Sequence, residues 1–173
     1  MSADPAPEPR RAGPGDALAL ADLWWRARLA AAPAIPLPVH DADEVRRWFA
    51  AVVVPEMDVW VIDESDRLAA LLVLHAGWIE QSYVDPERTG EGLGSTLVDL
   101  AKRAHPAGLD LWAFQANTGA RRFYERHGFT AVAETDGDNE EGAPDVRYHW
   151  PRERDPLPGA GGSAAPAGVT GPP

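Results

Sequence analysis

Apolar residues recur along the first third of this chain at the three- and four-residue spacing of helices. The spacing predicts a helix from Asp16 to Ala31, with Asp16 as its N-cap, and a second helix from Asp41 to Ala51. Between them, the run from Ala32 to Pro38 contains three prolines and is expected to be a loop. The buried stripe of the first helix would consist of Leu20, Leu23, Trp24 and Ala27, and that of the second helix of Val45, Trp48 and Phe49.

The rest of the chain alternates between strand-like and helical patterns. Two apolar runs, at 58–62 and 68–75, are separated by a polar turn and predict an antiparallel hairpin. A short strand is expected at 10–13, and the later elements are strand 78–84, helix 93–102, strand 109–114, helix 118–127, strand 129–134 and strand 146–150. Asn117 is expected to cap the last helix and Gly128 to end it. This order predicts an α+β fold with helices flanking a mixed, mostly antiparallel sheet, in which strands four and five form a central parallel pair.

Composition favours one domain with a tail at each end. The chain has 173 residues, of which 45% are hydrophobic, enough for one buried core. Residues 10–150 carry the periodic patterns and form the predicted domain. Residues 1–9 are rich in Pro and Ala, and residues 151–173 are rich in Pro, Gly and Ala. Neither segment shows periodicity, and we predict that both are disordered.

Charge and cysteine content exclude several classes of function. The 16 Lys and Arg residues against 27 Asp and Glu residues give a formal charge of −11, which disfavours nucleic acid and anionic membranes as partners and favours a cationic acceptor. Because cysteine is absent, disulfides, thiolate metal sites and acyl-cysteine intermediates are excluded. We expect a cytoplasmic protein, because a reducing compartment fits a chain without cysteine and no apolar stretch is long enough to cross a bilayer.

The chain is organised around the segment from Trp78 to Lys102. Its strand-like start is followed by a loop that carries Gly90, Gly92 and Gly94, and then by a helical pattern. Glycines remove the Cβ atoms that would keep a ligand away from the backbone, and a helix start adds unpaired amides and the positive end of its dipole. The segment therefore predicts an anion-binding turn, suited to a phosphate or a diphosphate.

A second pattern lies in the helix predicted at 118–127. Asn117, Ala120 and Tyr124 are three and four residues apart, so a helix places an amide, a small side chain and a phenol along one face. A thin ligand can lie over Ala120 between the two polar groups. A phenol has an ordinary pKa of about 10 and can donate a proton to a thiolate formed beside it.

These two patterns, in this order, resemble the acetyl-CoA-binding core of the GNAT superfamily of N-acetyltransferases. The resemblance rests on Val84-Asp85-Pro86 with the glycine loop that follows, and on the segment from Asn117 to Phe129. It implies a GNAT-like fold, in which the two central parallel strands are splayed, and acetyl-CoA as the acyl donor. The residues that it places at the cofactor are Tyr83, Val84, Thr89, Gly90, Glu91, Gly92, Leu93, Gly94, Ser95, Asn117, Ala120, Phe123 and Tyr124. One position departs from the family pattern, because Thr89 stands where Gln or Arg is usual, next to Arg88.

The resemblance also implies a reaction. The amine of an acceptor would attack acetyl-CoA, Tyr124 would protonate the departing CoA thiolate, and a backbone N–H near Val84 would hold the oxyanion. With no cysteine in the chain, direct attack in a ternary complex is favoured. The acceptor would be a primary amine of a small molecule or a peptide, and polyamines, aminoglycosides, amino acids and protein N-termini all stay open. Dimers are common in the family, so a homodimer also stays open.

Removal of a proton from that amine requires a base, and Glu80 is the only carboxylate on the predicted strand 78–84. We hypothesise that Glu80 is the base, directly or through water; the alternative is that it orders the substrate or faces solvent. Trp78 would contribute an aromatic wall for the amine. Alternation predicts one face of Trp78, Glu80, Ser82 and Val84 and an opposite face of Ile79, Gln81 and Tyr83.

Two other interpretations stay open. A GNAT-fold module that binds acyl-CoA without turnover fits the departure at Thr89. A dinucleotide-binding protein fits Gly90-x-Gly92-x-x-Ser95 and Asp110, although the glycines follow the strand too late for that motif. The acidic segment 136–142 lacks the glycine that a calcium loop needs at its sixth position, so we expect a solvated loop and no metal site.

Overall fold

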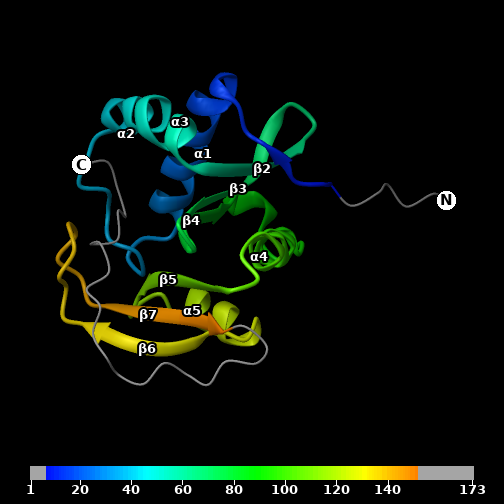
Figure 1. Ribbon diagram of the computed structural model, residues 1–173. Coiled ribbons are helices and arrows are strands. Elements are labelled where there is room, and N and C mark those ends of the chain that lie inside the picture. Colours follow the sequence, from blue (N-terminus) through cyan, green and yellow to red (C-terminus); the bar gives the residue numbers. More distant parts are fainter. Residues whose placement is uncertain (1–6, 152–173) are drawn as a thin grey trace.

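The computed structural model describes residues 7–151, and within them seven strands form one sheet in the order β1-β2-β3-β4-β5-β7-β6 (Figure 1). The strands are β1 (Arg10–Arg11), β2 (Asp58–Glu64), β3 (Arg67–His75), β4 (Trp78–Val84), β5 (Gly108–Phe114), β6 (Thr130–Thr135) and β7 (Asp145–Pro151). Strands β4 and β5 are parallel, and the other neighbouring pairs are antiparallel. The predicted mixed α+β sheet with a central parallel pair is therefore confirmed.

Helices cover both faces of the sheet (Figure 1). They are α1 (Ala17–Ala30), α2 (Ala42–Trp48), α3 (Val54–Glu56), α4 (Leu93–Ala104) and α5 (Thr118–Arg126), with short 3₁₀ turns at Pro14–Asp16 and Pro86–Arg88. The predicted second helix does not end at Ala51, because a π-helical turn at Phe49–Val53 carries the helical path on to Glu56. Burial of Phe49 and Val53 in the core outweighs the weak helix propensity of the β-branched residues there.

Asp16 precedes α1 as predicted but does not cap it. Its carboxylate accepts hydrogen bonds from the Gly13 amide at 2.8 Å and from the Arg10 guanidinium at 2.9 Å instead. These bonds hold the chain that leads from β1 into α1. Asp41, by contrast, caps α2 in a reciprocal pair with Glu44, each side chain accepting from the other residue's amide at 2.8 Å.

Two hydrophobic cores lie on opposite faces of the sheet. One joins α1 and α2 to β2 and β3, and the other joins α4 and α5 to β3, β4, β5 and β7. Strand β3 is shared by both cores and is buried without interruption from Leu68 to Leu74. Because helices cover both of its faces, its sequence is an unbroken apolar run rather than an alternating one.

Most of the two predicted tails lies outside the described residues. The structure says nothing about 1–6 or 152–173, so their predicted disorder stays a prediction. Within the described part, Pro151 is the last residue of β7 although the sequence placed it in the tail, and Arg10 begins β1 where the predicted domain begins.

The packing of α4 against the sheet generates a first prediction. Leu97 is fully buried in the core beneath α4, so Leu97→Ala should lower the free energy of unfolding by about 2–5 kcal/mol in urea titrations. Leu18→Ala on α1 is the matched control, because Leu18 is 63% exposed, and it should change the free energy by less than about 0.5 kcal/mol. Equal losses from the two variants would contradict the core described here.

Candidate active site

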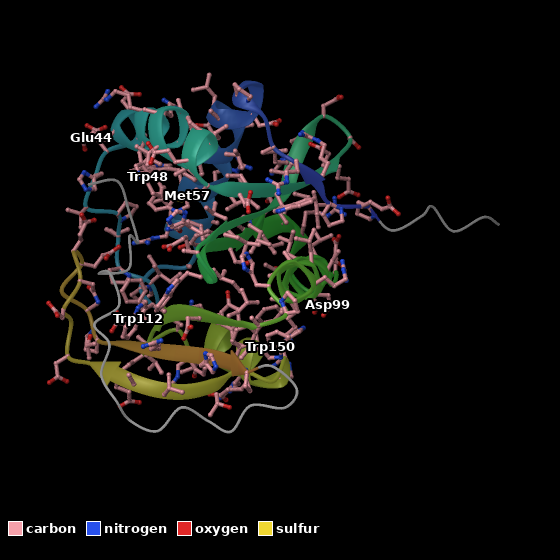
Figure 2. All side chains as sticks on the ribbon, in the orientation of Figure 1. Glu44, Trp48, Met57, Asp99, Trp112 and Trp150 are labelled. Atoms are coloured by element: carbon pink, nitrogen blue, oxygen red, sulfur yellow. The ribbon has the colours of Figure 1, made fainter. Side chains whose placement is uncertain are left out.

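Strands β4 and β5 are joined at one point and then separate. Trp78 is paired with Asp110, and the Asp110 amide donates to the carbonyl of Gly77 at 3.0 Å. Beyond this pair the two strands share no further ladder, and a cavity of about 690 Å³ lies between them. Its lining comes from α1, β4, the start of α4, β5 and α5. Trp112, labelled in Figure 2, contributes to this lining from β5.

The face assignment predicted for β4 is wrong for Ile79, because a β-bulge interrupts the strand at Glu80, whereas Gln81, Tyr83 and Val84 keep their predicted faces. The residues on either side of Glu80 pair with consecutive residues of β3, so Glu80 has no partner there. Ile79 consequently packs in the same core as Val84, whereas Gln81 accepts a hydrogen bond from Trp24 Nε1 of α1 at 2.9 Å. The bulge frees Glu80 from the alternation, and its side chain lines the cavity.

Trp78 is not among the residues that line the cavity. It lies at the paired end of β4, where the guanidinium of Arg147 is 5.0 Å from the centroid of its ring. Arg147 is itself bound to the Asp110 carboxylate at 3.0 Å. The structure therefore does not bring the expected aromatic wall to the site, and Trp112 and Phe114 of β5 supply aromatic lining instead.

Helix α5 forms one wall of the cavity. Asn117 caps the helix as predicted, its Oδ1 accepting a hydrogen bond from the Ala120 amide at 3.2 Å. Gly128, at a φ of +82°, ends it. Four predicted site residues of this segment line the cavity together: Asn117, Ala120, Phe123 and Tyr124.

The three glycines of the loop are required for two different reasons. Gly90 and Gly92 have φ values of +86° and +85°, in the left-handed region that favours glycine. At Gly94 the constraint is packing, because a Cβ there would lie 3.2 Å from the ring of Phe123 and 3.8 Å from Val84. Gly94 therefore lets the first turn of α4 lie close against α5, and it lines the cavity at that point.

Thr89 and Arg88 differ in their relation to the cavity. Thr89 lines it, and its hydroxyl donates to the Pro86 carbonyl at 3.2 Å. Arg88 is held by the Glu91 carboxylate at 2.6–2.9 Å and also forms an ion pair with Glu64. The charge of Arg88 is therefore paired with two carboxylates in this structure.

The remaining predicted residues lie around the same loop. Tyr83 and Val84 line the cavity from β4. Gly90, Glu91, Gly92, Leu93 and Ser95 are not among the lining side chains. The Leu93 side chain is buried in the core, and the Ser95 hydroxyl lies 3.0 Å from His127 Nε2. These five residues can reach a ligand chiefly through their backbone.

Tyr124 is the phenol that lines the cavity from α5. Its ring is 9% exposed and packs edge-on against Phe123 and Phe129, at centroid distances of 5.2 and 5.5 Å. Burial raises the pKa of Tyr124 to about 12, with a hydrogen bond to Ser82 acting in the opposite direction. The phenol is therefore protonated throughout the neutral pH range and can donate a hydrogen bond into the cavity.

Glu80 is the carboxylate at the cavity, and burial raises its pKa above the ordinary value. The charge of His75 opposes this shift. No side chain within 7–151 donates a hydrogen bond to Glu80 in the structure, so burial governs its titration. A carboxylate with a raised pKa is a stronger proton acceptor than an exposed one.

The sequence analysis missed a buried ion pair whose arginine lines the cavity. Arg28 Nη2 of α1 lies 2.8 Å from Glu141 Oε1, and the two side chains are 1% and 3% exposed. Glu141 belongs to the acidic loop that was expected to be solvated, so that expectation is wrong for this residue. A signal was present in the sequence, because Arg28 follows Trp24 by four residues on the apolar stripe of α1.

Asp85, just after β4, is a second residue whose role was missed. Its side chain is 1% exposed and accepts hydrogen bonds from Arg26 of α1 and the Glu87 amide, both at 3.0 Å, and from Arg67 of β3. Burial alone would raise the pKa of Asp85, but the bonds from Arg67, Glu87 and Arg26 together lower it. Asp85 thereby joins the start of the glycine loop to two other elements.

Within 7–151, no group of three or more His, Asp or Glu side chains is arranged to hold a metal ion. In the same part of the chain, no helix has the length and apolar character needed to cross a membrane.

A mixed sheet that opens between two central parallel strands, with a glycine turn and a helix start at the opening, defines the acyl-CoA N-acyltransferase class of fold. Comparison with known proteins agrees. Residues 55–131 match the family described as acetyltransferase (GNAT) domain. Over this stretch the chain is similar to the GNAT family, and the described residues have the fold of GNAT acetyltransferases. The rival dinucleotide-binding interpretation fails, because it requires a largely parallel sheet.

Individual relatives resemble different lengths of the chain. The peptidyl-lysine N-acetyltransferase YjaB of Salmonella typhimurium is 29% identical over 86 residues, which are 49% of this chain and 59% of that protein. The chain thus matches little more than half the length of this curated relative.

Solved structures match more of the chain at lower identity. Apo YjaB from Escherichia coli has a TM-score of 0.68 at 22% identity, covering 84% of this chain and 98% of the other. The ribosomal-protein-S18-alanine N-acetyltransferase from E. coli has a TM-score of 0.67 at 17% identity, covering 88% and 98%. YncA from S. typhimurium, solved with its cofactor acetyl-CoA, has a TM-score of 0.64 at 20% identity, covering 90% and 99%. At these identities the likeness shows the fold.

The Asp85 junction generates a second prediction. Asp85→Asn should lower the free energy of unfolding by about 1–3 kcal/mol at pH 7, because a buried carboxylate loses its charge while its donors remain. The folded pKa is lowered, so this contribution is present above the unfolded pKa of about 3.9 and is lost as the pH falls through the folded value.

Urea titrations of both proteins between neutral and acidic pH check this. The difference between wild type and Asp85→Asn should close at acidic pH. Asp58→Asn is the control, because Asp58 is 51% exposed and pairs with Arg11 at the surface, and it should cost less than about 1 kcal/mol. A difference in the free energy of unfolding between wild type and Asp85→Asn that stays constant with pH would contradict the role assigned to this carboxylate.

Proposed function

We propose that the chain is an N-acetyltransferase that transfers the acetyl group of acetyl-CoA to a primary amine. The observation that carries the proposal is the cavity at the separation of β4 and β5, which gathers Tyr124, Glu80 and Gly94 around one space. The names of two similar proteins support it. One is a peptidyl-lysine N-acetyltransferase, and the other was solved with its cofactor acetyl-CoA.

Acetyl-CoA would lie across the start of α4 and along α5. Its diphosphate would accept hydrogen bonds from backbone amides of the loop from Thr89 to Ser95, at the positive end of the α4 dipole. Its pantetheine arm would pass over Ala120 between Asn117 and Tyr124, all of which line the cavity. Because Arg88 is paired with Glu91 and Glu64, backbone amides rather than a side-chain cation would carry the diphosphate.

The geometry of β4 supports an oxyanion site at Val84. Amides of successive residues on a strand point to opposite edges. The Asp85 amide donates to the Ala69 carbonyl of β3, so the Val84 amide is directed to the edge that faces β5 and the cavity. An amide there can donate to the carbonyl oxygen of the thioester as negative charge develops on it.

The reaction then needs a sequence of proton transfers. Glu80, directly or through water, would accept a proton from the ammonium group of the acceptor, and the free amine would attack the thioester carbonyl carbon. Collapse of the tetrahedral intermediate breaks the C–S bond, and the leaving thiolate would take the phenolic proton of Tyr124. The second proton on the nitrogen of the intermediate would pass to the Tyr124 phenolate and restore the phenol. Glu80 would give the proton that it accepted to solvent, so the products are the amide, the CoA thiol and one released proton.

Direct attack in a ternary complex fits this chain, because cysteine is absent and no acyl-cysteine can form. The alternative is a module that binds acyl-CoA without turnover, and Thr89 was its one motif-level support. The position of a buried, protonated phenol on the cavity wall favours turnover instead.

The proposal is tested first by calorimetric titration with acetyl-CoA and by an acetyl-transfer assay with Tyr124→Phe. Acetyl-CoA should bind both proteins, with NAD and ATP failing to bind, and Tyr124→Phe should lower kcat by about 10²–10⁴-fold while leaving the Kd for acetyl-CoA nearly unchanged. The phenol acts on the leaving group and not in ground-state binding, so its loss should lower kcat without changing the Kd for acetyl-CoA.

Tyr148→Phe is the matched control. Tyr148 is fully buried, and its hydroxyl is bonded to Arg121 and Glu125 outside the cavity. It should lose stability but keep the turnover of its folded fraction. Absence of acetyl-CoA binding, or equal turnover in wild type and Tyr124→Phe, would contradict the assignment.

Glu80 generates a further prediction. The pKa of Glu80 is raised above the ordinary glutamate pKa of about 4.3. Wild-type kcat/KM should therefore fall as the pH drops through that raised pKa, because protonated Glu80 cannot act as a base. Glu80→Gln should remove this acid limb and lower the rate at neutral pH by about 10²-fold or more. Glu134→Gln, at an exposed site on β6, should keep both the limb and the rate. An unchanged pH–rate profile in Glu80→Gln would exclude Glu80 as the base.

A further inference from the structure

The cavity has a second wall, opposite α5, that the proposed function leaves to the acceptor. We call it the acceptor wall and define it by Ala27, Ala30 and Ala31 of α1, Ile35 after that helix, and Trp112 and Phe114 of β5, all of which line the cavity. The first four are small or aliphatic and the last two are aromatic. Apart from the indole N–H, this wall offers apolar side-chain surface to the molecule that carries the amine.

Charged groups at the cavity are few. Among its lining residues, the charged side chains are Glu80 and Arg28. Glu80 stands at the β4 bulge, where the reacting ammonium would lie. Arg28 lies beside the acceptor wall, with its guanidinium carbon 5.8 Å from the ring centroid of Phe114, and it is paired with Glu141 at 2.8 Å.

The Arg28–Glu141 pair is built into the fold. The guanidinium carbon of Arg28 lies 5.0 Å from the ring centroid of Trp24 and 5.8 Å from that of Phe114, and its Nη2 donates to the Pro36 carbonyl at 3.1 Å. Both members of the pair are almost fully buried. Full contact with aromatic, carbonyl and carboxylate partners leaves little of the positive charge to act on a ligand.

The loop that delivers Glu141 is itself structured. Asn139 Nδ2 donates to the Ala143 carbonyl at 2.7 Å and to Asp145 Oδ2 at 3.0 Å. A Cβ at Gly137 would lie 2.6 Å from the Gly142 carbonyl oxygen, so the loop is closed tightly on itself. Glu141 is thus presented to Arg28 by an ordered turn between β6 and β7.

From these observations we propose that the acceptor carries a single charged amine on an apolar stem, and that the Arg28–Glu141 pair enforces this choice by keeping net charge off the acceptor wall. The inference rests on the proposed N-acetyltransferase function. A second ammonium group would find no unpaired carboxylate on that wall, and a carboxylate beside the amine would find no unpaired cation. Polyamines, aminoglycosides and free amino acids are therefore disfavoured, whereas simple alkylamines and the side chain of a peptide lysine share the required chemistry.

The test compares acceptors that differ only in the far end of one stem. n-Pentylamine carries one charge, cadaverine carries a second ammonium, and δ-aminovalerate carries a carboxylate. Wild type should acetylate n-pentylamine with a kcat/KM about tenfold or more above that of the other two, because moving an uncompensated charge against an apolar wall is unfavourable. N-acetyl-lysine N-methylamide distinguishes a peptide lysine from a simple alkylamine as the acceptor. A kcat/KM above that of n-pentylamine would indicate a peptide lysine, and a kcat/KM below it would indicate a free monoamine.

Substitution of the pair should move this preference in a defined direction. Glu141→Gln removes the carboxylate that Arg28 contacts and so makes the net charge beside the acceptor wall more positive. The ratio of kcat/KM for δ-aminovalerate over n-pentylamine should therefore rise by about tenfold. The double variant Arg28→Met with Glu141→Leu removes both charges together and should keep the wild-type order of acceptors. Thermal unfolding of each variant identifies those that fold, and ratios between acceptors on one protein do not depend on the folded fraction.

The outcomes separate the two proposals. Wild-type preference for cadaverine, or an unchanged acceptor ratio in folded Glu141→Gln, overturns the inference and leaves the N-acetyltransferase function standing. Binding of acetyl-CoA with no transfer to any of the four acceptors overturns the proposed function and this inference with it.

Discussion

The separation of β4 from β5 is the constraint on which the rest of this structure depends. The two central strands share a single point of pairing, at Trp78 and Asp110, and then diverge. A sheet would ordinarily close its ladder along the whole length, because unpaired amides and carbonyls in the interior are costly. Here the open edges instead face a cavity, where a ligand can satisfy them. The fold thus leaves hydrogen-bonding groups available at its centre.

The two sides of that cavity are built by different physical means. On the α4 and α5 side the site is made from backbone, with glycines that set positive φ values or allow close helix packing, as Gly94 does against Phe123. On the α1 and β5 side the site is made from side chains, which are mostly apolar and lie beside the buried Arg28–Glu141 ion pair. Backbone amides suit a ligand whose binding groups are always the same, such as a diphosphate and a thioester. Side chains can be substituted, so a wall made of them can be adapted to a different acceptor.

Polar contacts between residues that are distant in sequence fix the positions of these two sides relative to each other. Asp85, the residue after β4, binds Arg26 of α1 and Arg67 of β3, so the start of the glycine loop is fixed to α1, which forms part of the opposite wall, and to β3. Arg28 and Glu141 join α1 to the loop between β6 and β7. Both carboxylates are nearly fully buried, and each is matched by arginine, which is how a buried charge is tolerated.

The local sequence pattern alone determined the secondary structure, the order of its elements and part of the cavity lining. Periodicity located the strands and helices, the spacing of Gly90, Gly92, Gly94, Asn117 and Tyr124 located one wall of the site, and the order of elements indicated the sheet. Each of these depends on residues that are close in sequence. Tertiary structure decided what depends on distant partners. The bulge that re-aims Glu80 arises from pairing with β3, and the burial of Glu141 arises from Arg28, 113 residues away. The α1 and β5 side of the cavity was therefore decided only by the tertiary structure, because its residues meet by packing and not by sequence spacing.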